Sequence, residues 1–591
     1  MCGFAGGFSP DKRFENMPLT TEHLELLRHR GPDGQGFYAD DHAMLGFRRL
    51  AIIDLAGGAQ PIYSEDEQIV VVVNGEIYNH HELRQQLQER HRFRSRVDGE
   101  VLVHLYEERG IDFVKELRGM FAFALYDRKA RRLVLGRDRA GQKPLYYKWD
   151  QGTLRFASEI KPLLRDGHAP VSRAAVADYL RFGYVPAPRT IFEGIHKLPA
   201  GTLLVAESGA APRLVPYWRL GFTHDDGQMP RPLEVEQWSE ALRSTLHEAV
   251  RIRLESEVPM GFLLSGGVDS ASVFALGAPG LETHRARAFT IGFKGSAIDE
   301  SPAAAEVARR YEADHRVIHL EREQARTLDD ILHQVEEPVS TDALLPTAAV
   351  FDAVARAGVT TVLSGEGSDE LFAGYRKFAV ATQDPELEGA SPLDRYLRHE
   401  EFVFSRRERA ALLGEDLDDG RFDELDREAR ELDPLSQMLL IETRLRLPDR
   451  INLRLDRTSM ARSIEARAPF MDHRVMEFAA KIPHAVRTGP DFTKRVLRRA
   501  MRDFLPDVVL SAKKAPFHAP DTWFTGADRD ESLLGASAVA EAGLVDAAAV
   551  QALRARARAG SRSAQERVFS LYVLHAWYHA FHRVERRAVA A

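Results

Sequence analysis

The chain has 591 residues, of which 44% are hydrophobic and 28% charged, and its formal net charge is -8. This composition is typical of a soluble globular protein with several domains, and the negative balance argues against nucleic acid or an anionic membrane as a partner. No apolar run reaches the roughly 18 residues of a membrane-spanning helix, and the first residues lack the apolar stretch of a signal peptide. A single cysteine cannot form an internal disulfide, so we expect a reducing, cytoplasmic location.

The only cysteine stands at position 2, in the opening stretch MCGFAGGFSP. A lone cysteine is usually a small buried hydrophobic residue. If Met1 is removed, however, Cys2 carries both a thiol and a free α-amine, whose reference pKa of about 7.7–8.0 lets it act as a base. A nucleophile activated by its own terminal amine is a known catalytic solution. The position therefore predicts a nucleophile, which also needs an oxyanion hole and a substrate clamp.

The first 205 residues or so have the pattern of short strands separated by turns, with two helical segments. β-rich composition predicts strands within residues 68–80, 119–127, 131–139, 143–149 and 153–159. Helical spacing of apolar residues predicts helices within 80–90 and 99–110. Many strands with few helices favour packed sheets flanked by helices.

Three polar clusters interrupt this pattern: RHRGPDGQG at 28–36, GFRRLAIID at 46–54 and NGEIYN at 74–79. Taken singly, they are ordinary turns. Taken in order with the initial MCG and the SRVDGEV of residues 95–101, they resemble the glutaminase domain of class II glutamine amidotransferases. That family consists of N-terminal-nucleophile hydrolases with stacked antiparallel sheets between helices, an α+β (αββα) fold.

The resemblance implies how this half would act on glutamine. The Cys2 thiol attacks the side-chain amide, with its own α-amine as the base. The Asn74 side chain and the Gly75 N–H form the oxyanion hole, which stabilises developing charge. Arg49 holds the glutamine α-carboxylate, for which a planar bidentate donor is suited, and Asp98 faces the α-ammonium. The implied glutamine-binding set is Arg49, Asn74, Glu76 and Asp98.

A change of pattern separates the two halves of the chain. Residues 206–235 are rich in Gly, Pro and polar residues and predict a linker between a glutaminase domain at 2–205 and a second domain at 236–591. In the second domain, strand segments at 261–267, 287–293, 315–320 and 358–364 alternate with helical segments at 269–278 and 301–313. Such alternation predicts an α/β fold with a mostly parallel sheet, where ligands bind beyond the carboxyl ends of the strands.

Two glycine loops follow predicted strands of this sheet: SGGVDS at 265–270 and SGEGSDE at 364–370. A glycine turn feeding a helix can present N–H groups to an anion, although no Walker A motif is present. SGGVDS after an apolar strand resembles the pyrophosphate loop of the ATP pyrophosphatases. This resemblance implies Mg²⁺ on Asp269 and Asp369, whose oxygens suit that ion. It also implies ATP binding by Leu263, Ser265, Gly266, Gly267, Asp269, Ser270, Ile291, Ser364 and Gly365.

In this order, the two halves resemble the glutamine-dependent asparagine synthetases over nearly the whole chain. Residues 457–479 look like that family's late helical signature, and TKRVLRRA places Lys494 where the family keeps a lysine near the acyl-adenylate. Glu366 is a candidate base or orienting group for ammonia attack. The family chemistry implies glutamine hydrolysis, adenylation of a carboxylate by ATP with release of pyrophosphate, passage of ammonia through the interior, and a homodimer.

The carboxylate acceptor stays open at this point. Some asparagine synthetases hold aspartate with an arginine, but residues 335–351 here contain Glu336, Glu337 and Asp342 and no arginine. The stretch at 511–520 also departs from the family's usual form. We favour aspartate, with another carboxylate in secondary-metabolite tailoring as the alternative. A glutaminase or glutamine sensor with an inactive synthetase half, or a ring-closing synthetase of the β-lactam type, is less compatible with the intact loops and with Cys2.

Two further segments carry weaker signals. The highly charged residues 384–433 predict solvated helices and loops, which could form a lid over the acceptor site. His575, His579 and His582 share one helical face in HAWYHAFH. Their spacing could suit zinc, but the interleaved aromatics favour packing of a C-terminal helix.

Overall fold

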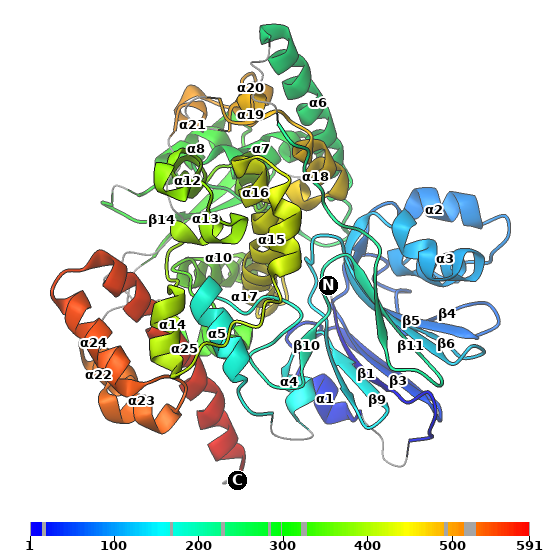
Figure 1. Ribbon diagram of the computed structural model, residues 1–591. Coiled ribbons are helices and arrows are strands. Elements are labelled where there is room, and N and C mark those ends of the chain that lie inside the picture. Colours follow the sequence, from blue (N-terminus) through cyan, green and yellow to red (C-terminus); the bar gives the residue numbers. More distant parts are fainter. Residues whose placement is uncertain are drawn as a thin grey trace.

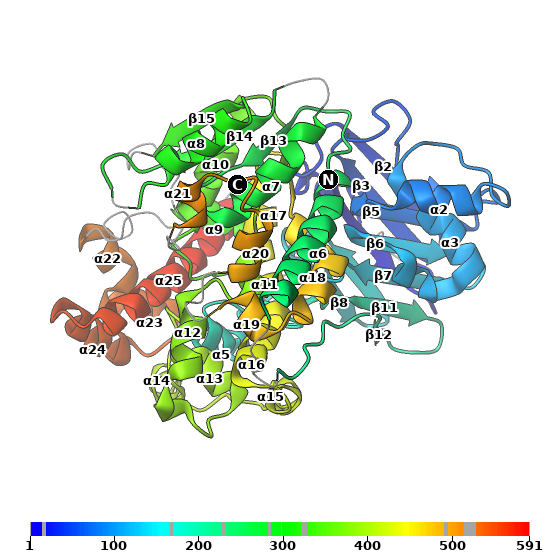
Figure 2. The same ribbon diagram turned by 90° about the horizontal axis from the view of Figure 1, so that it is seen from above.

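Three β-sheets organise the part of the chain that the structure describes, two antiparallel ones in the first half and a parallel one in the second (Figure 1). The structure is a computed structural model, and it describes residues 2–14, 19–165, 169–225, 231–281, 285–296, 298–320, 328–489, 494–512 and 527–589. In Figures 1 and 2, the sheets of the first half and helices α22–α25 lie on opposite sides of the molecule.

The first half contains two six-stranded sheets. In spatial order, the first comprises β10 (His196–Lys197), β8 (Tyr146–Asp150), β9 (Thr153–Ala157), β1 (Cys2–Phe8), β3 (Ala43–Arg49) and β2 (Gly34–Ala39). The second comprises β12 (Arg213–Pro216), β11 (Thr202–Glu207), β7 (Arg132–Arg137), β6 (Gly119–Asp127), β5 (Ile69–Ile77) and β4 (Ile62–Tyr63). The helical segments of this half are α1 (Thr21–Glu25), α2 (His80–Leu87), η1 (Asp98–Glu100), α3 (Val101–Arg109), η2 (Gly110–Glu116), α4 (Lys161–Leu164) and α5 (Arg173–Phe182).

Alternation along β5 shows how the layers stack. Val70 and Val72 pack with Phe4 of the first sheet, whereas Val71 and Val73 pack in the cluster that includes apolar residues of α2 and α3. Because successive side chains of a strand point to opposite faces, β5 is apolar on both sides and buried throughout. The sheets therefore face each other, with α2 and α3 on the outer face of the second (Figure 1).

The parallel sheet of the second half has the order β15 (Asp314–His319), β14 (Arg287–Gly292), β13 (Met260–Leu263), β16 (Thr361–Leu363) and β17 (Glu465–Arg467). Its early helices are α6 (Pro232–Arg251), α7 (Val268–Gly277), η3 (Ala278–Gly280), α8 (Ser301–Arg310), α9 (Leu328–Val335), α10 (Leu344–Arg356) and α11 (Ser368–Phe372). The chain runs from β13 outward to β15 and then returns to β16 on the other side of β13. Such a reversal opens a crevice at the carboxyl ends of the strands, which is where ligands bind in sheets of this type.

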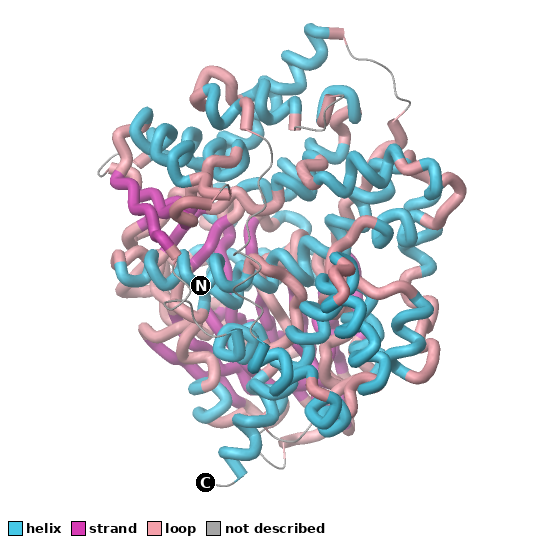
Figure 3. Tube along the Cα trace, turned by 90° about the vertical axis from the view of Figure 1, so that its left-hand side faces the viewer, coloured by secondary structure: helices cyan, strands magenta, loops and turns pink. Residues whose placement is uncertain are grey.

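The remainder of the second half is mainly helical (Figure 3). Its middle segments are α12 (Arg376–Gln383), η5 (Pro385–Leu387), α13 (Pro392–Arg398), α14 (Arg406–Leu413), α15 (Asp423–Arg430), α16 (Pro434–Ile441), η6 (Glu442–Ile451), α17 (Asn452–Met460), η7 (Pro469–Met471) and α18 (His473–Ala480). The last ones are α19 (His484–Arg487), α20 (Arg495–Ala500), α21 (Asp507–Leu510), α22 (Ala527–Leu534), α23 (Ala536–Ala542), α24 (Ala547–Arg558) and α25 (Arg562–Val589). The π-helical η6 joins α16 and α17 end to end, and it contains Pro448. No helix among the described residues combines the length and apolarity needed to cross a membrane.

The expected strands and helices are confirmed, whereas the expected linker is shorter than predicted. β11 extends to Glu207 and pairs with β12, so residues 206–216 belong largely to the second sheet rather than to a connection. Strand β12 is mostly exposed and carries the Arg and Pro of a polar segment, which concealed it.

The histidine-containing C-terminal helix packs as predicted. His575 is fully buried in α25, and burial lowers the pKa of its imidazole to about 4. Its neighbours Leu574, Ala576 and Trp577 belong to one hydrophobic cluster. The side chain of His582 lies outside the described residues.

Buried ion pairs join the two halves. Arg30 Nη1 lies 2.8 Å from Asp456 Oδ2, and neither side chain is more than 2% exposed. Burial alone would raise the pKa of Asp456, but the cations of Arg30 and Lys143 outweigh it and hold this pKa below its usual range. Further pairs across the junction are Arg457–Glu159, Arg118–Asp472, Lys197–Glu337 and Arg467–Glu76.

Candidate active sites

Cys2 begins the central strand β1 of the first sheet and is 7% exposed. Its backbone N–H donates to Asn74 Oδ1 at 3.0 Å, and its carbonyl accepts from Arg30 Nε at 3.1 Å. The thiol lies 3.9 Å from the Leu50 carbonyl oxygen. Burial raises the pKa of the thiol, so a base must take its proton when it acts as a nucleophile.

The Asn74–Gly75 pair lies on β5 of the second sheet, facing the start of β1. Asn74 is fully buried, and no described residue hydrogen bonds to its Nδ2. A buried amide N–H₂ without an acceptor costs free energy, which indicates that it serves a bound group. Gly75 has φ 138°, and a Cβ there would lie 1.9 Å from the Met120 carbonyl oxygen. Only glycine therefore fits, and the predicted oxyanion hole is placed beside Cys2.

The other predicted glutamine-binding residues lie around this pair. Arg49 is the register partner of Cys2, and its guanidinium donates to three carbonyls of residues 53–55. Asp98 is buried and accepts from the Ile77 N–H at 2.6 Å; burial raises its pKa. Burial, together with the Glu465 and Asp98 carboxylates, also raises the pKa of Glu76 well above its ordinary value. Buried carboxyl groups of this kind would be stabilised as anions by a bound ammonium.

A cavity of about 1590 Å³ opens at the carboxyl ends of β13, β14 and β16. It is lined by both glycine loops and by almost every residue that the sequence assigned to ATP and the acyl-adenylate. These are Leu263, Ser265, Gly267, Asp269, Ser270, Ile291, Ser364, Gly365, Glu366, Asp369 and Lys494. Gly266 does not line the cavity; a Cβ there would lie 3.0 Å from Glu300 and Ala303 side chains, so it packs against the start of α8.

Hydroxyl groups of the first loop hydrogen bond to its own backbone and fix its shape. The Ser265 N–H donates to Ser270 Oγ at 2.9 Å, and the Gly267 N–H donates to Ser265 Oγ at 3.1 Å. Gly267 is the residue before α7, so the helix N-terminus points into the cavity, where its dipole favours a phosphate. Gly365 of the second loop passes so close that a Cβ would lie 2.5 Å from the Ser270 nitrogen. The two loops therefore form one surface.

Asp269 and Asp369 converge on one cation. Lys494 Nζ lies 2.6 Å from Asp269 Oδ2 and 2.6 Å from Asp369 Oδ1. The Ser368 hydroxyl also donates to Asp269, at 2.7 Å. The two carboxylates thus reach a common point that the Lys494 ammonium occupies, and they offer hard oxygen donors of the kind that Mg²⁺ prefers.

The sequence reasoning missed a row of arginines on η6 and α17. Arg446, Arg450 and Arg454 are spaced by four residues and all line the cavity. Arg454 Nη2 lies 2.5 Å from Glu366 Oε1, so it orients the candidate base. The repeated spacing in ETRLRLPDRINLRLDR was the available signal, since residues four apart share one helix face.

These arginines also bear on the acceptor stretch at 335–351. Glu336 and Glu337 point away from the cavity into buried ion pairs with Arg457 and Lys197, and only Thr341, Asp342, Ala343, Thr347 and Val350 line it. Arg450 Nη2 donates to the Ser340 carbonyl at 2.7 Å, so a cation does reach this stretch, from another element. Residues 513–520 of the second departing segment lie outside the described residues.

Comparison with known proteins places this geometry in a family. The asparagine synthase family model matches residues 241–579, and the glutamine amidotransferase domain model matches residues 1–218. Asparagine synthetase [glutamine-hydrolyzing] 1 of Bacillus subtilis is 30% identical over 564 residues, covering 88% of this chain and 87% of that protein. Asparagine synthetase B of Escherichia coli is 32% identical over 538 residues (88% and 82%), and amidase chyE of Penicillium rubens is 31% identical over 580 residues (85% of each). The chain therefore belongs to the family of glutamine-hydrolysing asparagine synthetases.

Proposed function

We propose that the protein amidates a carboxylate with nitrogen from glutamine, using ATP, and that its acceptor is aspartate. The observation that carries this proposal is the presence of both sites in one chain. The first places Cys2 beside Asn74, whose Nδ2 has no hydrogen-bond acceptor among the described residues, and the second is a two-loop cavity with Asp269, Asp369 and Lys494 together. A glutaminase or sensor with an inactive synthetase half would not need to maintain that second arrangement.

At the first site, Cys2 performs the hydrolysis of glutamine. Its free amine, after loss of Met1, takes the thiol proton as sulfur attacks the side-chain carbonyl carbon, and the same proton leaves with ammonia. Asn74 Nδ2 and the Gly75 N–H stabilise the oxyanion. Water then cleaves the thioester to release glutamate. Arg49 pairs with the substrate α-carboxylate, and Glu76 and Asp98 receive its α-ammonium.

At the second site, the loop of Ser265, Gly267 and Ser270 holds the phosphates of ATP while the acceptor carboxylate attacks the α-phosphorus. Asp269 and Asp369 would hold a magnesium ion, which when bound would neutralise phosphate charge. Lys494 stabilises charge on the phosphate of the acyl-adenylate, and Glu366, held by Arg454, orients or deprotonates the incoming ammonia. Attack of the carboxylate on the α-phosphorus breaks the bond to the β-phosphate and releases pyrophosphate. Ammonia then attacks the acyl carbon and releases AMP, so the products are the amide, AMP and pyrophosphate.

Two kinds of carboxylate acceptor are compatible with the cavity, and the position of its arginines bears on the choice between them. The arginine expected between 335 and 351 is missing, and the cations of the cavity come from η6 and α17 instead. We propose that Arg450 or Arg454 meets the acceptor's second carboxylate when aspartate binds. A different carboxylic acid is the alternative, and the similarity to amidase chyE keeps it in view.

The deciding experiment measures AMP and pyrophosphate release with glutamine and ATP across aspartate and a panel of other carboxylic acids, with the amide identified by mass. Formation of asparagine supports the first candidate, and AMP release only with another acid supports the second. In Cys2→Ala, glutamine-driven amide should disappear while ammonia-driven amide persists. Glutamine hydrolysis with no AMP from any acid would refute a working synthetase half.

Further features stay predictions: the division into a glutaminase domain and a synthetase domain, the N-terminal-nucleophile class of the first half, a homodimer and a cytoplasmic location. The lid hypothesis for residues 384–433 is supported by His399, Glu400, Glu401 and Phe402, which line the cavity. Unchanged protease protection of this segment on adding Mg-ATP and aspartate would count against it.

A further inference from the structure

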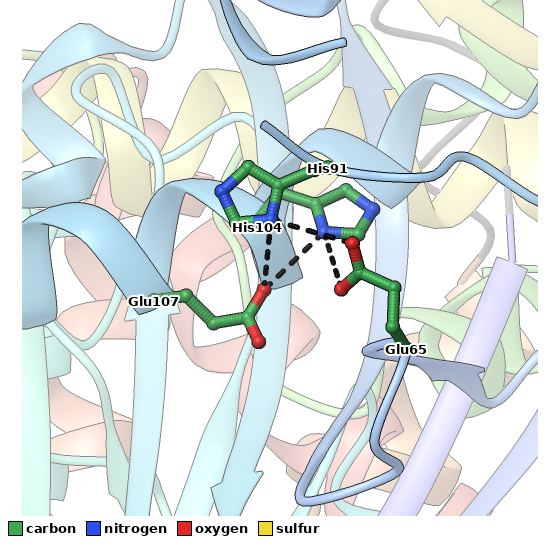
Figure 4. A group of neighbouring side chains, drawn as sticks. All are labelled: Glu65, His91, His104 and Glu107. Carbon is green, nitrogen blue, oxygen red and sulfur yellow. Dashed lines mark hydrogen bonds and ion pairs between the residues drawn. The ribbon is translucent and has the colours of Figure 1, made fainter. Parts of the chain in front are cut away.

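A second cluster of ionisable side chains lies on the outer face of the first half, where α3 covers the second sheet. Glu65 follows β4, His91 follows α2, and His104 and Glu107 belong to α3 (Figure 4). Their ligand atoms all lie within 4.8 Å of one another. None of the four lines the large cavity or is a residue assigned to glutamine.

The distances across this cluster are those of a coordination shell. His91 Nδ1 lies 3.5 Å from Glu65 Oε1 and 3.4 Å from Glu107 Oε2, and His104 Nδ1 lies 3.4 Å from Glu65 Oε2 and 3.3 Å from Glu107 Oε2. All four are longer than the ~2.7–3.2 Å of a normal N–H···O hydrogen bond. Ligands at ~2.0–2.1 Å from a tetrahedral zinc ion lie ~3.3–3.4 Å apart. The separations of the two imidazole nitrogens from Glu107 Oε2, 3.4 and 3.3 Å, therefore match two edges of a zinc tetrahedron, while Glu65 faces each histidine with a different oxygen.

The outer nitrogens of both imidazoles face carboxylates. His91 Nε2 lies 3.2 Å from Glu108 Oε1, and His104 Nε2 lies 3.9 Å from Glu100 Oε1. Glu100 is itself fixed by the Ser95 N–H at 2.8 Å. The Glu108 contact keeps the proton of His91 on Nε2 and leaves its Nδ1 lone pair for a metal, the arrangement found around histidine ligands in metalloproteins; Glu100, at 3.9 Å, lies beyond hydrogen-bond distance of His104 Nε2.

Charge and burial favour the same conclusion. His104 is 1% exposed and His91 13%, while Glu107 and Glu65 keep 25% and 34% exposure as an entry path. Two carboxylates and two neutral imidazoles carry a charge of −2, which one divalent ion cancels. Two histidine ligands select zinc over magnesium or calcium.

We propose that Glu65, His91, His104 and Glu107 bind one zinc ion. The ion ties α3 to Glu65 in the turn after β4 and to the segment between α2 and η1. That segment, residues 88–97, leads directly into Asp98 of the glutamine site. The role of the ion is thus to fix the shape of this segment rather than to take part in chemistry.

The test uses the full-length protein, stripped with chelator and then titrated with ZnCl₂ by calorimetry, with bound metal counted by mass spectrometry. The expected result is one zinc per chain, a higher melting temperature with zinc, and a tetrahedral visible spectrum with cobalt. His91→Gln and Glu107→Gln should each weaken zinc binding at least tenfold and abolish the shift in melting temperature. His247→Gln, on the exposed face of α6, is the matched control and should bind like the parent.

One other group of ligating side chains provides an internal check. His80, His81 and Glu255 also lie within reach of a common ion. If zinc binding survives His91→Gln and is lost in His81→Gln, the assignment is wrong. Absence of stoichiometric zinc in the parent protein would equally overturn it and leave the first cluster as imidazoles paired with carboxylates.

Discussion

Asn74 offers the sharpest test of the proposed glutaminase site, because its two side-chain atoms do different work. Oδ1 accepts the Cys2 backbone N–H at 3.0 Å, whereas no described residue occupies Nδ2. Asn74→Asp keeps an oxygen for the first contact and removes the donor, and Asn74→Ala removes both. Loss of one oxyanion donor costs about 2.7–4 kcal/mol of transition-state stabilisation, equivalent to a fall of about 10²–10³ in kcat.

The assay is glutamate release under saturating glutamine, with ammonia-driven amide formation measured on the same preparations. Both variants should lose glutaminase kcat by that factor and retain ammonia-driven activity. Asn74→Ala should also raise KM or lower thermal stability, since it leaves the Cys2 N–H without its acceptor. If Asn74→Asp keeps kcat within threefold of the parent, the empty Nδ2 is not the oxyanion donor and the reasoning fails.

Three further predictions follow from buried groups. Asp456→Asn removes one of the two carboxylates that pair with the buried Arg30 cation, Glu159 being the other, and should cost up to about 3–5 kcal/mol, seen as a lower urea midpoint; an unchanged midpoint would contradict it. Burial, with Asp369 nearby, raises the pKa of Glu370 to about 7, above the ordinary value of about 4.3. Protonated Glu370 therefore stabilises the fold, fully below about pH 4, and this stabilisation is lost as pH rises through 7. The parent's melting temperature should fall between pH 5 and 8, and that of Glu370→Gln should change less over the same range. Arg454→Ala removes a charged hydrogen bond to Glu366 worth about 1.5–3 kcal/mol, so ammonia-driven amidation should fall about 10–100-fold with glutaminase kcat intact; equal loss of both would refute a local role.

Local patterns accounted for most of the fold and for the loops of the sites. Strands such as β5 and β6 are apolar on both faces, and the glycine loops directly follow short apolar strands. Both signals depend only on residues that are neighbours in the sequence, so they can be recognised without knowing the fold. Gly75 and Gly365 are likewise constrained by close backbone approaches that only glycine tolerates.

Contacts between distant segments could not be predicted in the same way. Gly266 belongs to the SGGVDS motif, yet it packs against α8 because of where that helix lies, which the motif does not encode. Arg450 reaches the acceptor stretch from a helix more than a hundred residues later. The zinc cluster draws on three separate segments whose sequences contain no metal motif.

The buried ion pairs between the halves limit which glutaminase and synthetase halves of related proteins can be joined in one chimeric chain. Arg30 and Lys197 of the first half neutralise Asp456 and Glu337 of the second, each pair inaccessible to water. A glutaminase half transplanted from a relative must bring a cation to each of these places, or it strands a charge that costs several kcal/mol. Chimeras that break a pair should fail to dock their halves even when both parent proteins fold normally. Chimeras that exchange both members of the pair should dock normally again. A domain swap at this junction must therefore supply both members of each buried ion pair.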